Sequence, residues 1–133
     1  MCGRYGFTVE NEKEFLERFD LENAAFDLKE NWNVAPTQEM PIVERHSPNS
    51  VHLRKWGMQP SWSPIYLINA KSEKLVESRF WHKPFTTSRV IVPASYFIEW
   101  QKLDDKTKQP YVIRLKSKEM FGFAGLLVTV KPL

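Results

Sequence analysis

The sequence predicts an α+β domain dominated by β-strands. Short runs rich in β-branched and aromatic residues recur along the chain, and Pro, Gly, Asn and Ser separate them. Residues 10–19, in contrast, have the apolar spacing of an amphipathic helix. A length of 133 residues fits one domain, so the domain is taken as residues 1–133.

The strands are expected in the apolar or alternating runs, at residues 3–9, 41–46, 51–56, 89–93, 96–101, 111–116 and 121–130. Residues 47–50 have the sequence Ser-Pro-Asn-Ser, which predicts a turn. The strands on either side of that turn are therefore expected to pair as a hairpin.

The remaining segments are expected to be helical turns or loops. Thr8 is expected to cap the helix over residues 10–19, because acidic side chains follow it in the first turn. Residues 26–36 and 57–64 lack a sustained period and are expected to be irregular, whereas residues 72–78 are expected to form one or two helical turns.

Charge and composition exclude several protein classes. The net charge is +3, which permits nucleic-acid binding without requiring it. No apolar run approaches the roughly 18 residues of a membrane span, and the first residues lack a secretory signal's apolar core. We therefore expect a cytoplasmic protein without a membrane partner. The single cysteine excludes a disulfide framework and a multi-cysteine zinc site, and neither a metal nor a cofactor is predicted.

Aromatic residues make up 14% of the chain and include five tryptophans. Many of them must form the core, because aromatic side chains dominate core energetics, and Trp100 is expected there. Such side chains also stack on unpaired nucleobases, so the composition suits a protein that binds single-stranded nucleic acid.

Cys2 is the residue whose position alone suggests chemistry, although the simpler interpretation is a small buried apolar side chain. Removal of Met1 would leave Cys2 first, with an amine and a thiol on adjacent carbons. The α-amine has a pKa of about 7.7–8.0, against about 10.4 for lysine, so much more of it is unprotonated near pH 7. It can attack an aldehyde to give an imine, and the thiol can then close a thiazolidine ring.

Several short motifs follow one another along the chain: MCGRY at 1–5, WNVAPTQ at 32–38, WGMQPSW at 56–62, NAKSE at 69–73, SRFWHKPF at 78–85, PASYFIEW at 93–100, QPYVIRL at 109–115 and FAGL at 123–126. Together they resemble the SRAP family (SOS-response-associated peptidase), whose members shield abasic sites in single-stranded DNA. The resemblance implies an SRAP-like mixed, barrel-like β core with short flanking helices. It also implies single-stranded DNA containing abasic sites as the partner.

The resemblance implies three catalytic residues. Cys2 matches the nucleophile that crosslinks to the ring-opened sugar aldehyde, Asn69 in NAKSE matches an asparagine that steadies the sugar oxygen, and Glu99 matches a glutamate that moves protons. From the residues alone, Asn69 could equally close a turn after an apolar run, and Glu99 could lie on the solvated face of a strand.

The resemblance also implies DNA contacts. Arg4 and Lys71 match basic positions that face phosphates, and Trp62 lies in a loop whose aromatic residues stack on or wedge beside bases. Lys71 stands where family members often carry arginine, so it lacks the bidentate fork of a guanidinium. The simpler interpretations are solvated charges at Arg4 and Lys71 and a packed loop anchor at Trp62.

The chain departs from the family pattern after FAGL. Family members usually continue for several dozen residues, including a His-x-Arg-Met-Pro segment, and nothing here matches it. The domain over residues 1–133 is therefore expected to lack the family's C-terminal segment and to have an incomplete core. His46, His52 and His82 are interpreted as surface or loop histidines. If the last strand has an unpaired edge, self-association through it is expected.

Three functions remain open. The favoured one is an abasic-site sensor that forms a covalent thiazolidine crosslink with single-stranded DNA through Cys2. The second is a cysteine peptidase, including one that removes only its own leader, which would require a positioned base such as histidine. The third is a non-catalytic fragment that binds single-stranded DNA with a salt-sensitive affinity indifferent to the lesion.

Overall fold

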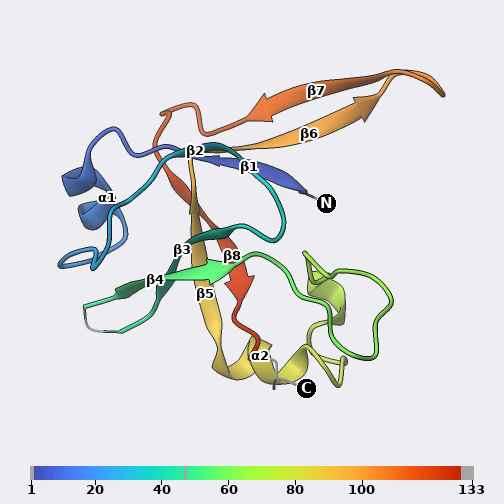
Figure 1. The fold of residues 1–133 in the computed structure, drawn as a ribbon, viewed down its shortest axis with the longest axis horizontal. Coiled ribbons are helices and arrows are strands. Elements are labelled where there is room, and N and C mark those ends of the chain that lie inside the picture. Colours follow the sequence, from blue (N-terminus) through green and yellow to red (C-terminus); the bar gives the residue numbers. More distant parts are fainter. Residues whose placement is uncertain (1, 47, 130–133) are drawn as a thin grey trace.

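A computed structural model describes residues 2–46 and 48–129 of the chain. These residues form two four-stranded antiparallel sheets with short helices beside them, which confirms the predicted strand-dominated α+β fold (Figure 1). The strand orders are β2-β1-β6-β7 and β4-β3-β5-β8. The sheets are not closed into a barrel, which corrects the barrel-like core that the resemblance implied.

The first sheet holds the amino-terminal strand in its interior. It consists of β2 (Asn31–Val34), β1 (Arg4–Phe7), β6 (Tyr96–Lys102) and β7 (Lys108–Ile113). β1 pairs with β6 in a register that sets Arg4 opposite Ile98, so the start of the chain lies beside the middle of β6. The β6–β7 hairpin projects from the body of the molecule, and every residue of β7 is exposed (Figure 1).

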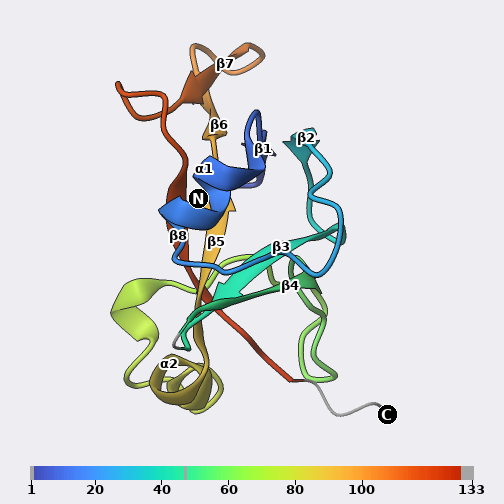
Figure 2. The same ribbon diagram turned by 90° about the vertical axis from the view of Figure 1, so that its left-hand side faces the viewer.

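The second sheet consists of β4 (Ser50–Lys55), β3 (Glu39–Glu44), β5 (Arg89–Ala94) and β8 (Phe121–Leu126). β3 and β4 form the predicted hairpin. Only Ser95 separates β5 from β6, and its amide donates to the Gly6 carbonyl oxygen at 2.8 Å. The chain therefore runs from the second sheet into the first with little interruption (Figure 2).

Both sheets and α1 (Glu12–Arg18) contribute to one hydrophobic core. Its buried side chains are Tyr5, Phe7, Phe15, Leu21, Val34, Met40, Val43, Val51 and Ala94. The rings of Phe7 and Phe15 meet edge to face with centroids 5.8 Å apart, which fixes α1 against β1. Burying one such ring contributes about 1.5–3 kcal/mol, so this contact anchors a helix too short to be stable by itself.

The start of α1 differs from the prediction. Asn11, rather than Thr8, caps the helix, and its side-chain oxygen accepts the Lys13 amide at 2.9 Å. The Thr8 hydroxyl instead donates to Ser95 Oγ at 2.9 Å, at the junction between the two sheets. The prediction for Thr8 was wrong because its tertiary partner lies far along the chain, where no local pattern reveals it.

Two elements were not predicted. β2 lies within the segment expected to be irregular, because its four residues are too few to give that segment a sustained period, and it forms because β1 offers an edge. α2 (His82–Thr87) was also missed. The expected turn over residues 72–78 is present in part as the 3₁₀-helix η1 (Ser72–Lys74). The strand expected over 121–130 ends at Leu126, and its last residue lies outside the described residues.

The helices are short. α1 spans seven residues and α2 spans six. Within the described part of the chain, no helix is long and apolar enough to cross a membrane. The cytoplasmic location stays a prediction.

Candidate active site

Cys2 lies two residues before the start of β1 and is partly buried. Its thiol donates a hydrogen bond to the Arg4 carbonyl oxygen at 3.1 Å. Burial raises the pKa of the thiol, hydrogen bonding with the Arg4 backbone lowers it, and the nearby Glu99 carboxylate raises it again. The net direction is upward, so the thiol is protonated at neutral pH, with its hydrogen directed at a backbone carbonyl.

Asn69 reaches Cys2 from a distant part of the chain. Its Nδ2 donates to the Cys2 carbonyl oxygen at 2.8 Å. The segment before Asn69 is itself held, because the Trp56 indole donates to the Ile68 carbonyl oxygen at 2.9 Å. Backbone hydrogen bonds in both directions between Met58 and Leu67 close the loop between them. The amide of Asn69 therefore has a fixed position against the backbone of Cys2.

Glu99 approaches the same thiol from β6. It follows Ile98, which pairs with Arg4 across the sheet, and its carboxylate interacts electrostatically with Cys2. Glu99 is partly buried. The structure thus brings Asn69, from a loop, to the backbone of Cys2 and Glu99, from β6, near its thiol.

The predicted DNA-contact residues lie at different places. Arg4 is two residues from Cys2, and its Nη1 donates to Asn33 Oδ1 at 3.2 Å, which ties β1 to β2. Lys71 is exposed and stands two residues after Asn69, directly before η1. Arg4 and Lys71 are therefore each within two residues of a predicted catalytic residue, and Arg4 is partly buried whereas Lys71 is exposed.

Trp62 belongs to the closed loop between Met58 and Leu67, and its side chain is 60% exposed. One edge of the indole meets the ring of Phe80, with centroids 5.0 Å apart, and Phe80 in turn packs on Trp81 at 4.7 Å. The Trp62 side chain is therefore largely exposed, and its contact with the Phe80–Trp81 pair holds it in place.

An open groove runs along the β6–β7 hairpin beside Glu99. Its walls are residues 99–101 of β6 and residues 111–113 of β7. Trp100 was expected in the core but is 47% exposed in this groove. It lies where the β6–β7 hairpin projects from the body of the molecule, and the last three residues of β6 are exposed (Figure 1). Alternation along β6 did not reveal where the strand leaves the body of the molecule.

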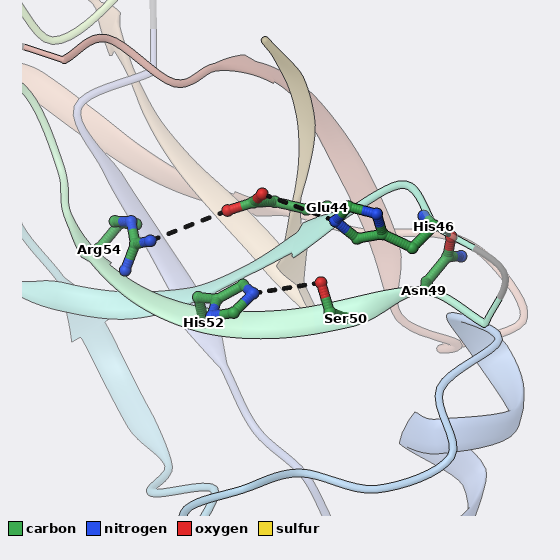
Figure 3. A network of polar contacts seen from close by, with 6 residues as sticks. All are labelled: Glu44, His46, Asn49, Ser50, His52 and Arg54. Atoms are coloured by element: carbon green, nitrogen blue, oxygen red, sulfur yellow. Dashed lines mark hydrogen bonds and ion pairs between the residues drawn. The ribbon is translucent and has the colours of Figure 1, made fainter.

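The three histidines have partners elsewhere. Figure 3 shows His46 and His52 on the β3–β4 hairpin, within a polar network that also includes Glu44, Asn49, Ser50 and Arg54. His82 begins α2, and its Nδ1 lies 3.0 Å from the Val76 carbonyl oxygen. Across residues 2–46 and 48–129, no three His, Cys, Asp or Glu side chains gather in a way that could hold a metal ion.

Sequence reasoning missed Trp56 as part of this site. The residue lies in the WGMQPSW motif, but no spacing indicates that its indole would support the segment leading to Asn69. Its ring also meets Tyr5 edge to face at 5.4 Å, so Trp56 connects the core below Cys2 to the loop that carries Asn69.

Comparisons with known proteins show which family the chain is similar to. A family model described as SOS response associated peptidase (SRAP) matches residues 1–132. The abasic site processing protein YoqW of Bacillus subtilis is 37% identical over 134 residues, covering 95% of this chain and 59% of that protein. The abasic site processing protein YedK of Escherichia coli is 33% identical over 119 residues, covering 85% of this chain and 53% of that protein.

Solved structures show the same fold. A phage-related protein of Bordetella bronchiseptica superimposes with a TM-score of 0.78 at 28% identity, covering 94% of this chain and 60% of that one. A protein of Bacteroides thetaiotaomicron gives 0.74 at 20% identity, which bears on the fold alone. The chain spans about 60% of the length of the first of these relatives. From the matched motifs, the shared fold and the extent of the family match, the chain belongs to the SOS response associated peptidase (SRAP) family.

Proposed function

We propose that this chain acts on DNA containing abasic sites and captures the lesion in single strands as a covalent thiazolidine crosslink through Cys2. The observation that carries the proposal is the convergence of the Asn69 amide and the Glu99 carboxylate on Cys2. The names of the relatives, abasic site processing proteins, support the same substrate class.

The chemistry begins with the α-amine that removal of Met1 would free. The amine attacks the aldehyde carbon of the ring-opened sugar, and the resulting carbinolamine loses water to give an imine. The Cys2 sulfur then bonds to the imine carbon, the π electrons of the C=N bond move to nitrogen, and nitrogen takes up the proton that the thiol gives up. No oxidant is needed, and the only leaving group is the water lost before closure.

The roles of the neighbouring residues follow from their contacts. Asn69 holds the Cys2 carbonyl, so it restricts the direction in which the amine on the same residue can point. Glu99 lies close enough to the sulfur to influence its ionisation, which suits a group that carries protons between sugar oxygen, nitrogen and sulfur. Arg4, Lys71 and Trp62 are proposed to hold the strand by phosphate contact and by stacking.

A peptidase is the second candidate, because the family description contains that word. Acyl transfer by cysteine requires a thiolate with a lowered pKa and a positioned base. Burial and Glu99 instead raise the pKa of the Cys2 thiol, and the described contacts of the three histidines lie elsewhere. A mechanism in which the amine attacks first fits these conditions better. Cleavage of unrelated peptides by the purified chain would favour the peptidase.

The test of the proposal is an intact-mass measurement after mixing the chain with a single-stranded oligonucleotide that contains one abasic site. We expect a chain that begins at Cys2 and a heat-stable adduct with the oligonucleotide. Cys2→Ala should form none, and Cys2→Ser should form only an imine that borohydride must reduce before it survives heating. An oligonucleotide without the lesion is the control.

Two results would contradict the proposal. A wild-type chain without Met1 that forms no adduct would exclude crosslinking. Equal, salt-sensitive affinity for damaged and undamaged strands, again without an adduct, would support the non-catalytic binding fragment.

Self-association is proposed for the edge of the second sheet. Among the described residues β8 pairs with β5 alone, which leaves backbone groups on its other side available to a second strand. Sedimentation at increasing concentration measures this directly. A monomer at all concentrations would exclude it and leave the crosslinking proposal untouched.

A further inference from the structure

One buried polar atom of the first sheet has no partner. Tyr5 is 2% exposed, and within the described part of the chain its hydroxyl is the buried side-chain oxygen that makes no hydrogen bond. Buried hydroxyl groups are nearly always paired, so an unpaired one calls for a specific explanation. A partner that exists only during the reaction is one such explanation.

The position of this hydroxyl is fixed by its ring. Tyr5 meets Trp56 edge to face at 5.4 Å and Phe123 at 5.9 Å, so the phenol cannot turn toward solvent. Cys2 packs against the cluster to which Tyr5 belongs, and Tyr5 and Cys2 interact electrostatically. Burial is the main reason that the pKa of Tyr5 is raised, and the Cys2 thiolate raises it further. At neutral pH the phenol therefore keeps its proton and can donate it in a hydrogen bond.

The Cys2 sulfur needs such a donor when it loses its proton. In the protonated form the thiol donates to the Arg4 carbonyl oxygen. A thiolate cannot keep that bond, because a carbonyl oxygen has no hydrogen to offer. The Glu99 carboxylate disfavours the negative sulfur, and hydrogen bonding with the backbones of Arg4 and Ile98 favours it. A neutral hydroxyl that reached the sulfur from the core would add a further donor and offset the effect of Glu99.

We propose that Tyr5 is a positioning residue whose hydroxyl donates a hydrogen bond to the Cys2 sulfur in its anionic form, and so favours closure of the thiazolidine ring. The effect on ring closure rests on the proposed function, whereas the hydrogen bond to the anionic sulfur does not. In the closure step the S–C bond forms, the C=N π electrons become a nitrogen lone pair, and nitrogen takes the proton released by sulfur. Tyr5 keeps its own proton throughout.

The first test needs no DNA. The rate at which iodoacetamide alkylates Cys2 is measured against pH for the wild type and Tyr5→Phe, a change that removes the hydroxyl and keeps the ring packing. Loss of one hydrogen bond to a charged sulfur should raise the thiol pKa and slow alkylation near pH 7 by about tenfold. Tyr96→Phe is the matched control, because the Tyr96 hydroxyl donates to the Trp32 carbonyl oxygen on the far side of β1.

Folding does not obscure this test. Tyr5→Phe removes an unpaired hydroxyl, so thermal unfolding should occur at the wild-type temperature or above it. An alkylation profile that is the same for Tyr5→Phe and the wild type would overturn the proposal. That outcome would mean the hydroxyl is only a structural defect or is paired with a buried water.

The second test uses the abasic oligonucleotide. In Tyr5→Phe the borohydride-trappable imine should accumulate and ring closure should slow about tenfold, while imine formation keeps its rate. Closure at the wild-type rate would overturn the catalytic half of the proposal. If the wild type forms no adduct, the proposed function fails, and the alkylation profile still decides whether Tyr5 supports the thiolate.

Discussion

One polar side chain of the first sheet differs from the polar side chains beside the second sheet. On the second sheet, Glu44 contacts both Arg54 and His46, at 3.9 Å each. Asn49 uses both ends of its amide, accepting the His46 backbone N–H at 3.1 Å and donating to the Phe19 carbonyl oxygen at 3.0 Å. On the first sheet, the Tyr5 hydroxyl is buried without a partner in the described part of the chain.

The difference indicates where a ligand is expected. A polar group whose partners all belong to the protein stabilises the fold and has little capacity left for another molecule. A buried group with capacity left over costs free energy in the unliganded protein, and that cost is recovered when a partner binds. Substitutions made in pairs, one beside Cys2 or the first sheet and one in or beside the second sheet, therefore test this difference.

The largest contrast is expected between Asn69→Ala and Asn49→Ala. Loss of the Asn69 amide frees the Cys2 carbonyl, so the reacting amine loses its direction and the adduct should form on the order of a hundredfold more slowly. Loss of Asn49 removes two hydrogen bonds from the hairpin, which should lower the free energy of unfolding by about 1–2 kcal/mol. Denaturing gels give the first quantity and urea unfolding gives the second.

Each member of this pair serves as the other's control. Asn49→Ala should crosslink at the wild-type rate under conditions where it is folded. If both variants lose stability and neither changes the rate, Asn69 is the turn-closing residue of its simpler interpretation, and the contrast between the sheets does not extend to the site.

Local elements of the fold could be predicted, and elements that depend on distant partners could not. The β3–β4 hairpin was predicted because alternating strands and a Ser-Pro-Asn-Ser turn lie within one short segment. β2 was missed because it spans only four residues of an irregular segment and its stability comes from pairing with β1. Its Trp32 is exposed and adds no core contact that would mark the strand. The cap of α1 was misplaced for the same reason, since Thr8 bonds across to Ser95.

The site follows the same rule. The motifs indicated Cys2, Asn69 and Glu99 one at a time, but sequence separation as large as that between Cys2 and Asn69 prevented any argument that they meet. Tyr5 carried no signal, because a tyrosine on a central strand looks like any aromatic core residue. Only the packing around it reveals that its hydroxyl is left unpaired.

A smaller contrast is expected between Gly6→Ala and Gly122→Ala. A Cβ on Gly6 would overlap the Tyr96 ring, which is held because its hydroxyl donates to the Trp32 carbonyl oxygen at 2.7 Å. A Cβ on Gly122 would overlap the Cγ2 methyl of Ile91, a branched side chain that is 40% exposed and can yield only by turning about χ1.

Gly6→Ala should therefore lower the free energy of unfolding by about 2 kcal/mol. Gly122→Ala should lower it by less, about 1 kcal/mol, because the half-exposed Ile91 can change rotamer toward solvent and the lost backbone freedom of glycine in the unfolded chain offsets part of the strain. Urea unfolding measures both values. Equal losses would mean that the rings over β1 are no more tightly fixed than the aliphatic face of the second sheet.

The smallest contrast is expected between Arg4→Lys and Arg54→Lys. Nη2 of Arg54 lies 3.9 Å from the Glu44 carboxylate, so much of its charge is already balanced. The described side-chain partner of Arg4 is the neutral amide of Asn33, which leaves the positive charge available to a phosphate. Replacing the guanidinium of Arg4 by an ammonium keeps that charge and removes the bidentate fork, so affinity for an undamaged single strand should fall about threefold.

Arg54→Lys should leave affinity unchanged, as measured by fluorescence anisotropy at several salt concentrations. Equal changes would mean that phosphates meet both sheets alike, and that strand binding depends on the overall charge of the domain rather than on the residues beside Cys2.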